Sequence, residues 1–463
     1  MPVPPSAEDA PLFDRLRSAA AGVEWPALPA ADAALLLSLL FQFDRSQWWK
    51  PERLRAAQMR QLAALVRHAA STVPFYRARF KAAGFDAEKE WGDAEFARLP
   101  LLARRDLQSS FDALKSERVP PSSGRVVEGH TSGSAGAPVR FLWTQLTGVF
   151  WQALTLRDHV WHRRDVGAKL AAIRSKVQEG EHAGWGSAVD LVASTGNSVL
   201  FDVRNDLDLQ LRWLQQQDAA YFLTFASNMR ALAQRSRELG IRLPGLREVR
   251  TIAEALAPDA RALCREAWGV PLVDVYSTQE VGYIALQCPQ HEHYHVQSES
   301  LLVELLDDEG RACGPGETGR VVVTSLHNYA MPLVRYDVGD YAQAGSACPC
   351  GRGLPVITRI AGRVRNMLHL PDGRRHWASL VGMRPAMPVV LRQFQCVQRS
   401  LQEIVMRVVC DRPLTAGEES QVRSALQSAL GHAFAVNIEY CEKLERSAGG
   451  KFEEFKSELE SGN

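Results

Sequence analysis

The sequence predicts an α/β protein with two domains, a large one over residues 1–362 and a small α+β domain over residues 363–463. Three observations predict this class. Apolar residues recur at helical spacing through the first ~115 residues. From Val126 onward, short β-like runs alternate with helical stretches, which is typical of parallel β–α units in doubly wound sheets. Beyond Gly362, the last ~100 residues have their own pattern of strands and a helix, enough chain for a separate domain.

The helical entrance comes first in the chain. Residues Arg53–Thr72 repeat apolar positions at helical spacing until Pro74 stops the helix, and shorter helices are expected over Phe75–Ala83 and from Asp93. In the alternating region, the expected strands are 126–130, 139–144, 169–174, 219–225, 248–256 and 271–277, with helices over 146–162, 228–239 and up to Trp268. More antiparallel strands are expected over 301–306, 319–325 and 333–340, and the small domain should hold strands 362–370, 403–411 and 435–440 with a helix over 416–430.

Composition is that of an ordinary globular protein. Hydrophobic residues make up 46% and charged residues 23% of the 463 residues, which excludes a disordered chain, collagen and a coiled coil. A formal net charge of +1 provides no general basic field for nucleic acid. No apolar run approaches the ~20 residues of a membrane span, and the N-terminus is Pro-rich and acidic, unlike a signal peptide. We therefore expect a cytoplasmic protein whose eight cysteines are core residues, metal ligands or reactive thiols.

The most informative segment is His130–Pro138, a loop of glycines and hydroxyl residues between two expected strands. Its backbone N–H groups could curl round phosphate oxygens, although most such loops are plain connectors. It is not a P-loop, because no Lys-Ser/Thr follows the glycines. His130 itself could line a substrate pocket or be a buried neutral histidine.

Three later segments add chemistry to this loop. Tyr276–Gly282 places an aromatic ring, two hydroxyls and a carboxylate after an apolar strand, at the sheet edge where open α/β sheets bind ligands. Leu333–Asp340 places two carboxylates and an arginine in a tight turn. Leu444–Phe452 carries Lys451 on a glycine turn.

In this order and at these separations, the four segments resemble the adenylate-forming superfamily, the acyl-CoA synthetases and their relatives. TSGSAGAP resembles its phosphate loop, YSTQE its Tyr-Gly-x-Thr-Glu motif, RYDVGD its Tyr-Arg-x-Gly-Asp motif and ERSAGGK its C-terminal Arg-x-x-x-Gly-Lys element. The helical entrance and CPCGRGLPVITRIAGR look more specifically like the phenylacetate–CoA ligase branch, which includes capsule-biosynthesis relatives. The resemblance spans roughly residues 50–460 and implies a large adenylate-forming domain followed by a small mobile domain that carries the catalytic lysine.

The resemblance also implies roles for individual residues. Lys451 would bridge the substrate carboxylate and the α-phosphate, and Glu280 would hold Mg²⁺. The nucleotide would be bound by Thr131, Ser132, Gly133, Ser134, Gly136, Ala253, Glu254, Tyr276, Ser277, Thr278, Asp340 and Arg363. Within that set, the loop residues would cradle the phosphates, Tyr276 would stack on adenine, and Asp340 would accept hydrogen bonds from the ribose hydroxyls. Arg365 occupies the family's hinge position between the domains.

The chain departs from the family pattern at several of these positions. Ala137 replaces the usual lysine of the phosphate loop, Ser277 a glycine and Asp337 an arginine, and Asn366 follows the hinge arginine in place of an acid. The glycine-rich continuation after the hinge is replaced by HLPDGRRHW. These departures leave adenylation credible and leave the final acyl acceptor open.

Two short clusters of soft ligands predict a structural zinc site. Cys288 with His291 or His295 forms one half, and Cys348 with Cys350 the other, which together could hold a closed tetrahedral Zn²⁺. Spacing favours His291 and His295 over His293 and does not decide between the two. Two ordinary turns with solvent-facing histidines are the alternative.

The predicted activity is ATP-dependent activation of a carboxylic acid, of the aryl or arylacetic class, to an acyl-adenylate that is transferred to coenzyme A. The alternatives are transfer to an amine, a hydroxyl or a carrier-protein thiol, and a nucleotide-binding relative without catalysis. The acid pocket would draw on residues 143–161 and 194–203, with 222–228 as a further candidate segment. We expect ATP, Mg²⁺ and coenzyme A as ligands, no nucleic-acid or membrane partner, and a homodimer as an open alternative to a monomer.

Overall fold

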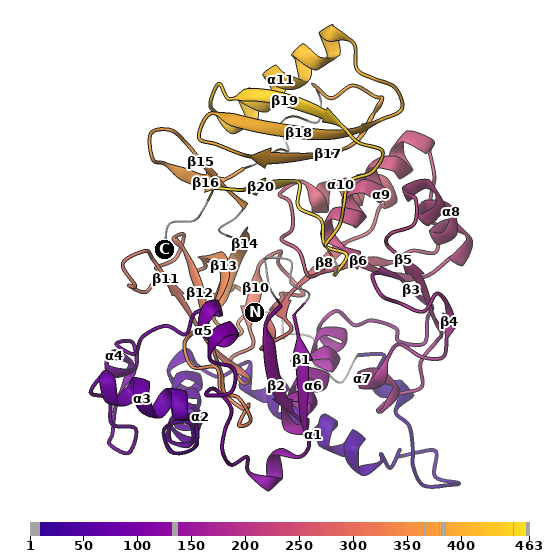
Figure 1. The fold of residues 1–463 in the computed structure, drawn as a ribbon. Helices are drawn as coiled ribbons and strands as arrows, with labels where there is room; N and C mark the ends of the chain where they lie inside the picture. Colours follow the sequence, from indigo (N-terminus) through magenta and orange to yellow (C-terminus); the bar gives the residue numbers. More distant parts are fainter. Residues whose placement is uncertain are drawn as a thin grey trace.

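A computed structural model describes residues 10–131, 138–363, 366–378, 380, 383, 386–447 and 449–459. The chain begins with a layer of helices at the base of the molecule (Figure 1): α1 (Ala31–Ser46), α2 (Pro51–Thr72), α3 (Pro74–Ala82), α4 (Asp93–Phe96) and α5 (Arg104–Ser109). Pro51 and Pro74 stand at the first positions of α2 and α3, where a missing N–H costs nothing. Within the described ranges, no helix is long and apolar enough to cross a bilayer.

A twelve-stranded sheet, counted over the described residues, forms the centre of the molecule. Its order is β11-β12-β13-β14-β10-β9-β8-β7-β6-β3-β5-β4. The strands are β3 (Leu170–Arg174), β4 (Gly180–His182), β5 (Ser198–Asp202), β6 (Tyr221–Phe225), β7 (Glu248–Ile252), β8 (Leu272–Thr278), β9 (Gly282–Gln287), β10 (Tyr294–Val296), β11 (Leu301–Leu306), β12 (Thr318–Ser325), β13 (Tyr336–Ala344) and β14 (Val356–Arg363). Strands β5, β3, β6, β7 and β8 pair in parallel, and the rest pair antiparallel, as the alternation of the sequence predicts.

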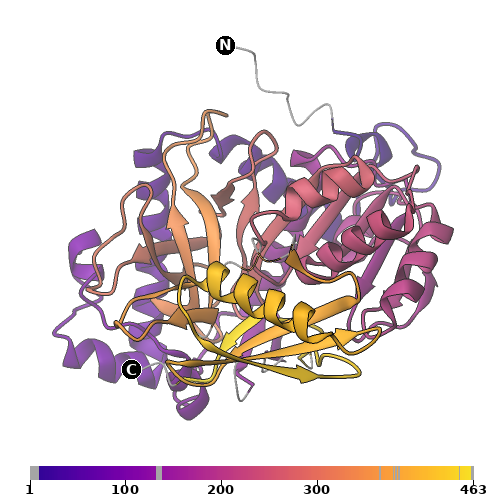
Figure 2. The ribbon, with the colours of Figure 1, turned by 90° about the horizontal axis from the view of Figure 1, so that it is seen from above.

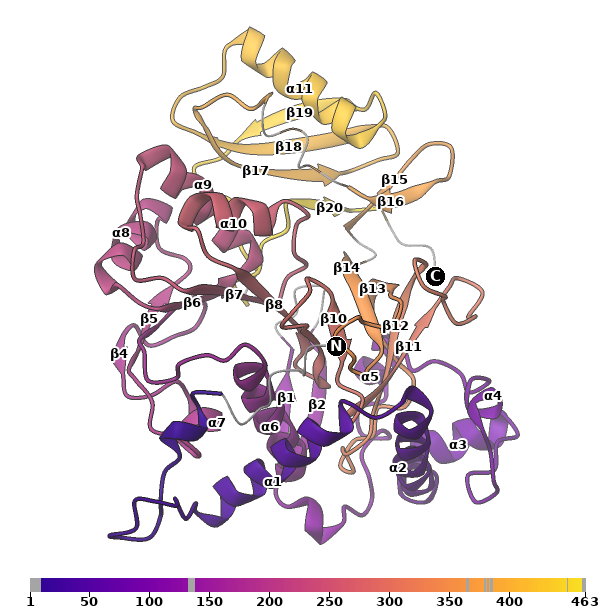
Figure 3. The same cartoon turned by 180° about the vertical axis from the view of Figure 1, so that it is seen from behind.

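Helices cover both faces of the parallel part (Figure 3). Helices α8 (Leu207–Gln217), α9 (Ala226–Leu239) and α10 (Ala260–Trp268) pack on one face through a cluster that includes Ile173, Phe222 and Val249. Helices α1 and α6 (Gln145–Trp161) bury the other face around Leu154, Val275 and Leu286. Because side chains alternate along a strand, this arrangement sends neighbouring residues of each strand to opposite helical layers. A separate hairpin, β1 (Val126–His130) with β2 (Arg140–Thr144), brackets the expected phosphate loop, and the short helix α7 (Ser187–Asp190) packs near α6.

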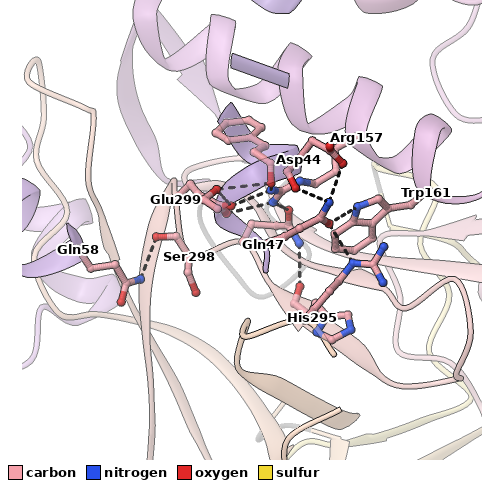
Figure 4. Close-up of polar contacts among 12 residues, drawn as sticks. Asp44, Gln47, Gln58, Arg157, Trp161, His295, Ser298 and Glu299 are labelled. Carbon is pink, nitrogen blue, oxygen red and sulfur yellow. Dashed lines mark hydrogen bonds and ion pairs between the residues drawn. The ribbon is translucent and has the colours of Figure 1, made fainter. Parts of the chain in front are cut away.

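A buried polar network joins the helical entrance to the sheet (Figure 4). The Arg157 guanidinium of α6 donates to both carboxylate oxygens of Glu299 at 2.7 and 3.0 Å and to the Phe43 carbonyl of α1. Gln47 accepts from the Trp161 indole at 2.9 Å, and Gln58 of α2 donates to the Ser298 carbonyl at 2.9 Å. These hydrogen bonds tie α1, α2 and α6 to the sheet, although Arg157 Nε and Ser298 Oγ have no partner among the described residues.

The C-terminal part lies across the carboxyl ends of the parallel strands (Figure 2). It contains the hairpin β15 (Met367–His369) and β16 (Arg375–Trp377), a four-stranded sheet of order β19-β18-β17-β20, and one helix packed on it, as counted in the residues described. The remaining elements are β17 (Leu391–Gln398), β18 (Glu403–Cys410), α11 (Ala416–Leu430), β19 (Ala435–Tyr440) and β20 (Phe455–Ser457). The expectation of one strand over 362–370 was wrong. Strand β14 ends at Arg363, next to Gly362 with a φ of +109°, and β15 pairs with a different strand.

Candidate active site

A cavity of about 1060 Å³ opens between the parallel strands and the C-terminal part. It brings together most of the residues that the motifs singled out: Thr131, Ala253, Glu254, Tyr276, Ser277, Thr278, Glu280, Asp340, Arg363 and Lys451. The four segments are far apart in the sequence, and the fold brings them together around one cavity. The roles assigned to these residues stay predictions, which the geometry below makes specific.

Lys451 enters the cavity on a tight turn. The Ser447 N–H donates to the Lys451 carbonyl at 2.9 Å, and Gly450 has a φ of +80°, a conformation that favours glycine. The turn rests on the large sheet, because the Ser175 hydroxyl donates to the Gly449 carbonyl at 2.7 Å. A Cβ added to Gly450 would lie 2.6 Å from the Ser175 Cβ, so only glycine permits this approach. Burial, followed by the charge of Arg363, lowers the pKa of Lys451, while Asp340, Glu254 and Glu280 oppose that shift.

Two carboxylates face Lys451, Glu280 from the turn between β8 and β9 and Asp340 from β13. Asp340 of β13 accepts from the Tyr276 hydroxyl at 3.0 Å and lies 3.4 Å from the Arg363 Nε. Glu280 accepts from the Tyr336 hydroxyl at 3.2 Å. Burial and the neighbouring Asp340 raise the pKa of Tyr276, which therefore remains a hydrogen-bond donor. Each carboxylate is held in place by a phenol, and the second oxygen of Asp340 also faces Arg363.

The Ala253–Glu254 turn is where the large part meets the C-terminal turn. Ala253 has a φ of +71°, a left-handed conformation that is strained for a residue with a side chain. Glu254 accepts from the Phe452 N–H at 2.7 Å and from the Ser227 N–H at 2.8 Å, and burial raises its pKa. The Glu254 side chain thus serves the contact between the two parts of the chain, and the backbone of its turn lines the cavity.

Of the expected phosphate loop, only Thr131 is described. Its hydroxyl accepts from the Val139 N–H at 3.0 Å and from the Arg104 guanidinium at 3.3 Å. Ser132, Gly133, Ser134 and Gly136 lie outside the described residues, as does the hinge residue Arg365. Arg104 was missed by sequence reasoning, although it stands in the LARRDL segment that resembled the ligase branch. Thr278 Oγ1 is buried with no hydrogen-bond partner among the described residues.

The segments expected to form an acid pocket line the cavity only in part. Trp143, Trp151 and Phe225 line the cavity as expected from the first and third candidate segments, but no residue of 194–203 does. That segment was a wrong choice, because β5 lies beyond β3 in the sheet, away from the cavity. His130 lines the cavity with a side chain that is more than half exposed, 3.5 Å from Glu128, which excludes the buried alternative.

The cysteine cluster has the geometry of a metal centre. One ligand atom each from Cys288, His295, Cys348 and Cys350 lies within 4.8 Å of the others, and all four residues are buried. Cys288 and Cys348 are 3.9 Å apart at sulfur, and His295 Nε2 is 3.4 Å from Cys350 Sγ. Bonds of ~2.3 Å to sulfur and ~2.0 Å to nitrogen place tetrahedral ligand atoms about 3.5–3.8 Å apart, so these separations fit zinc.

Of the three candidate histidines, the geometry selects one. His295 belongs to the four, whereas His291, ranked beside it from spacing, does not. His293 Nε2 lies 2.9 Å from Cys348 Sγ, as a second partner of that sulfur. The cluster joins the β9–β10 region to the segment before β14, none of its four residues lines the cavity, and the Trp161 ring packs beside His295 at 5.8 Å between centroids.

The chain is similar in sequence to phenylacetate–coenzyme A ligases. It is 25% identical to the enzyme of Thermus thermophilus over 384 residues, covering 78% of this chain and 82% of that protein. It is 24% identical to the enzyme of Escherichia coli K12 over 328 residues, covering 68% and 72%. Residues 378–458 match the CapK C-terminal domain family.

Solved structures extend this similarity over the whole architecture. 2-Hydroxyisobutyryl-CoA ligase in the postadenylation state, in complex with 2-HIB-AMP, gives a TM-score of 0.70 at 19% identity, covering 89% of this chain and 91% of that one. The same ligase in the thioesterification state, with 2-HIB-AMP and CoA, gives 0.58 at 20% identity, covering 89% and 92%. These likenesses confirm the fold class and the resemblance that the four motifs predicted.

Proposed function

Because the chain is a homologue of the phenylacetate–CoA ligases and has the fold of adenylate-forming CoA ligases, we propose that it activates a carboxylic acid with ATP and passes the acyl group to coenzyme A. The observation that carries this proposal is the position of Lys451, whose turn lies in one cavity with Glu280, Asp340 and Thr131. A cation, two fixed carboxylates and the end of a phosphate-type loop are the groups that adenylate formation requires.

In the first step, a carboxylate oxygen of the acid attacks the α-phosphorus of ATP in line, and pyrophosphate leaves. Lys451 would lie between the two reacting anions and offset the negative charge that accumulates at the α-phosphate. Its lowered pKa is compatible with this task, because desolvation strengthens its field while Asp340, Glu254 and Glu280 favour the charged form. Asp340 would accept from the ribose hydroxyls, since Tyr276 and Arg363 hold it in a fixed orientation.

Glu280 is the residue that fits Mg²⁺, because its carboxylate is buried at the cavity wall and is oriented by a hydrogen bond from the Tyr336 hydroxyl to one of its oxygens. A bound magnesium ion would neutralise phosphate charge and orient the leaving pyrophosphate. Thr278, the last residue of β8 and two residues before Glu280, offers a buried hydroxyl that has no partner within the described residues and could serve the same phosphates.

In the second step, a thiolate sulfur attacks the acyl carbon, AMP leaves, and the proton of the thiol passes to solvent. The C-terminal part would have to rotate first, because the Lys451 turn closes the cavity above the site. The arrangement resembles the postadenylation state of 2-hydroxyisobutyryl-CoA ligase more than its thioesterification state, which supports an adenylation-competent arrangement here. Transfer to an amine, hydroxyl or carrier thiol is the alternative outcome of this step.

The first test measures acid-dependent exchange of pyrophosphate into ATP for aryl, arylacetic, fatty and amino acids. The acid with the highest exchange rate is then incubated with coenzyme A, an amine, a hydroxyl compound or a carrier protein, and the acylated product is identified. Lys451→Ala should lower the exchange rate at least ~100-fold and leave thioester formation from added acyl-adenylate nearly unchanged. Lys443→Ala, on an exposed residue of the same segment, is the matched control. Wild-type exchange in Lys451→Ala would disprove the catalytic assignment.

We further propose that Cys288, His295, Cys348 and Cys350 bind Zn²⁺ as a closed structural site. Three thiolates and one imidazole fill a tetrahedral shell and leave no open position, so this ion would take no part in the reaction. The expected finding is one zinc per chain by elemental analysis, lost in Cys350→Ser and retained in Cys441→Ser, whose thiol lies outside the cluster.

A further inference from the structure

The floor of the cavity is a row of side chains from neighbouring parallel strands. Leu223 of β6 pairs in register with Arg250 of β7, and Phe225 pairs with Ile252. Residues paired in a parallel sheet point to the same face, so Arg250 and Ile252 lie on the face that α6 covers. Trp151 of α6 packs on Tyr283 at 5.3 Å between ring centroids, and both residues line the cavity. The cavity therefore has aromatic walls and a floor that carries an arginine.

The charge of Arg250 is compensated beneath the floor. Its guanidinium lies 2.8 Å from Asp158, which also pairs with Arg164 at 2.7 Å, and Arg164 pairs with Glu248 at 2.6 Å. Two arginines are thus matched by two carboxylates in the interior. The neighbouring His159 and His162 add no charge, because burial lowers the pKa of both well below neutrality.

Arg174 is different. It stands at the carboxyl end of β3, lines the same cavity, and has no side-chain hydrogen bond or ion pair among the described residues. Desolvation, followed by the charge of Arg250, lowers its pKa, although the side chain stays open to solvent at the end of the strand. Arg174 therefore adds a positive charge at this end of the cavity that no carboxylate of the described residues pairs with.

Tyr283 supplies a second donor at this place. Its hydroxyl accepts from Arg250 at 3.4 Å and lies 3.2 Å from the Thr155 hydroxyl, whose own proton goes to the Trp151 carbonyl at 3.0 Å. A bound anion would compete with Thr155 for the phenolic proton. Tyr283 also interacts with Arg174, since its phenol opposes the fall in the pKa of that arginine. An uncompensated guanidinium and a phenol that both face a cavity form a site for an anion.

We propose that the acid activated here carries a second carboxylate, bound by Arg174 and Tyr283, so that the substrate is a dicarboxylic acid. This inference rests on the proposed function and specifies its substrate. Strand β3 lies three strands from β8 in the sheet, roughly 14 Å at the usual strand spacing, so the second carboxylate would sit at the end of the acid remote from the reacting one. Trp143 and Trp151 would line the apolar stretch between the two.

The test compares matched pairs of acids in pyrophosphate exchange, with the complete chain: hexanoate against hexanedioate, and 4-methylbenzoate against benzene-1,4-dicarboxylate. The wild type should prefer the dicarboxylate of at least one pair in kcat/KM. Arg174→Met should lower kcat/KM for that dicarboxylate roughly 10- to 100-fold and change the matched monocarboxylate by less than about threefold. Arg174→Lys should recover part of the loss, because it restores the charge without the planar fork.

Two further measurements separate the outcomes. Arg242→Met, on an exposed arginine outside the cavity, should behave as the wild type. An equal rise in the KM for ATP with every acid in Arg174→Met would assign Arg174 to the nucleotide and overturn the inference. Activation of monocarboxylates alone, unchanged in Arg174→Met, would overturn it while leaving the proposed function intact. Exchange with none of the acids screened, and no difference between the wild type and Lys451→Ala, would instead overturn the proposed function.

Discussion

The two walls of the cavity are built differently. The wall formed by the parallel strands is held from beneath by buried ion pairs, in which Asp158 alone joins Arg164 and Arg250. The wall formed by the C-terminal turn is held by contacts between two parts of the chain that have separate sheets, such as Ser175 to the Gly449 carbonyl and Arg230 to Glu454. The ion pairs beneath the strands lie within one of these parts. The proposed two-step reaction therefore predicts a permanent half of the cavity, the strand wall, and a removable half, the C-terminal turn.

Breaking the permanent half should have the largest effect. Asp158→Asn removes the carboxylate shared by two buried arginines and should lower the free energy of unfolding by about 3–5 kcal/mol. Chemical denaturation with a fluorescence readout measures this change. Asp372→Asn, in an exposed pair with Arg374, is the control and should leave the stability unchanged. A small loss in Asp158→Asn would mean that the ion pairs do not secure this wall.

The sequence predicted residues that stand in short motifs better than residues that are positioned by strand register. Helix α11 begins with a capping box at Thr415 and Glu418 and ends at Gly431, and these local signals fixed its bounds. Lys451, Glu280 and Asp340 were found because each stands in a short motif of unusual composition. Arg174 and Arg250 were not found, because a charged residue in a strand is ordinarily expected to face solvent, and only the register of β3, β6 and β7 places them at a cavity.

The choice of metal ligands marks the same limit of sequence reasoning. Spacing could bring Cys288 together with any of three nearby histidines. The antiparallel pairing of β10 with β14, which sets His295 opposite Val356, decides which imidazole faces Cys350. Contacts between segments that are distant in the sequence depend on register, which local patterns do not encode.

A change of pH should also alter the stability of the permanent half. Asp274 of β8 accepts from Thr251 at 2.6 Å and from Tyr294 at 2.7 Å, and burial raises its pKa to about 6. The folded state then binds more protons than the unfolded state between about pH 4 and 6. Stability from this group is therefore present below pH 4 and is lost as the pH rises through 6, by about 3 kcal/mol.

Asp274→Asn isolates this contribution. Because the amide does not titrate, the variant should gain about 3 kcal/mol relative to the wild type between pH 4 and pH 7. Denaturation curves of both proteins at several pH values measure the difference. A difference that stays constant with pH would show that Asp274 keeps an ordinary pKa.

The proposed zinc site allows a third test of stability, because its ligands connect segments of the antiparallel part of the sheet. At a free zinc concentration 100 times the dissociation constant, the ion should add about 2.7 kcal/mol to stability. Chelation should therefore lower the melting temperature of the wild type and leave that of Cys350→Ser unchanged. An equal response of the two proteins to the chelator would contradict the assignment of the cluster as the zinc site.

Loosening the removable half should have the smallest effect on stability and a selective effect on the reaction. Arg230 of α9, which is almost fully buried, bridges Asp259 at 2.7 Å and Glu454 at 2.6 Å, the latter just before β20. Glu454→Gln leaves Arg230 its other partner, so the closed arrangement should lose only about 1 kcal/mol, since partly exposed pairs contribute little. The adenylation rate should fall several-fold, while thioester formation from added acyl-adenylate should be unchanged or faster, because that step needs the open arrangement.

Glu442→Gln, on an exposed residue of the same part, serves as the control. Equal slowing of both steps by Glu454→Gln would mean that the C-terminal part does not separate from the sheet during the reaction.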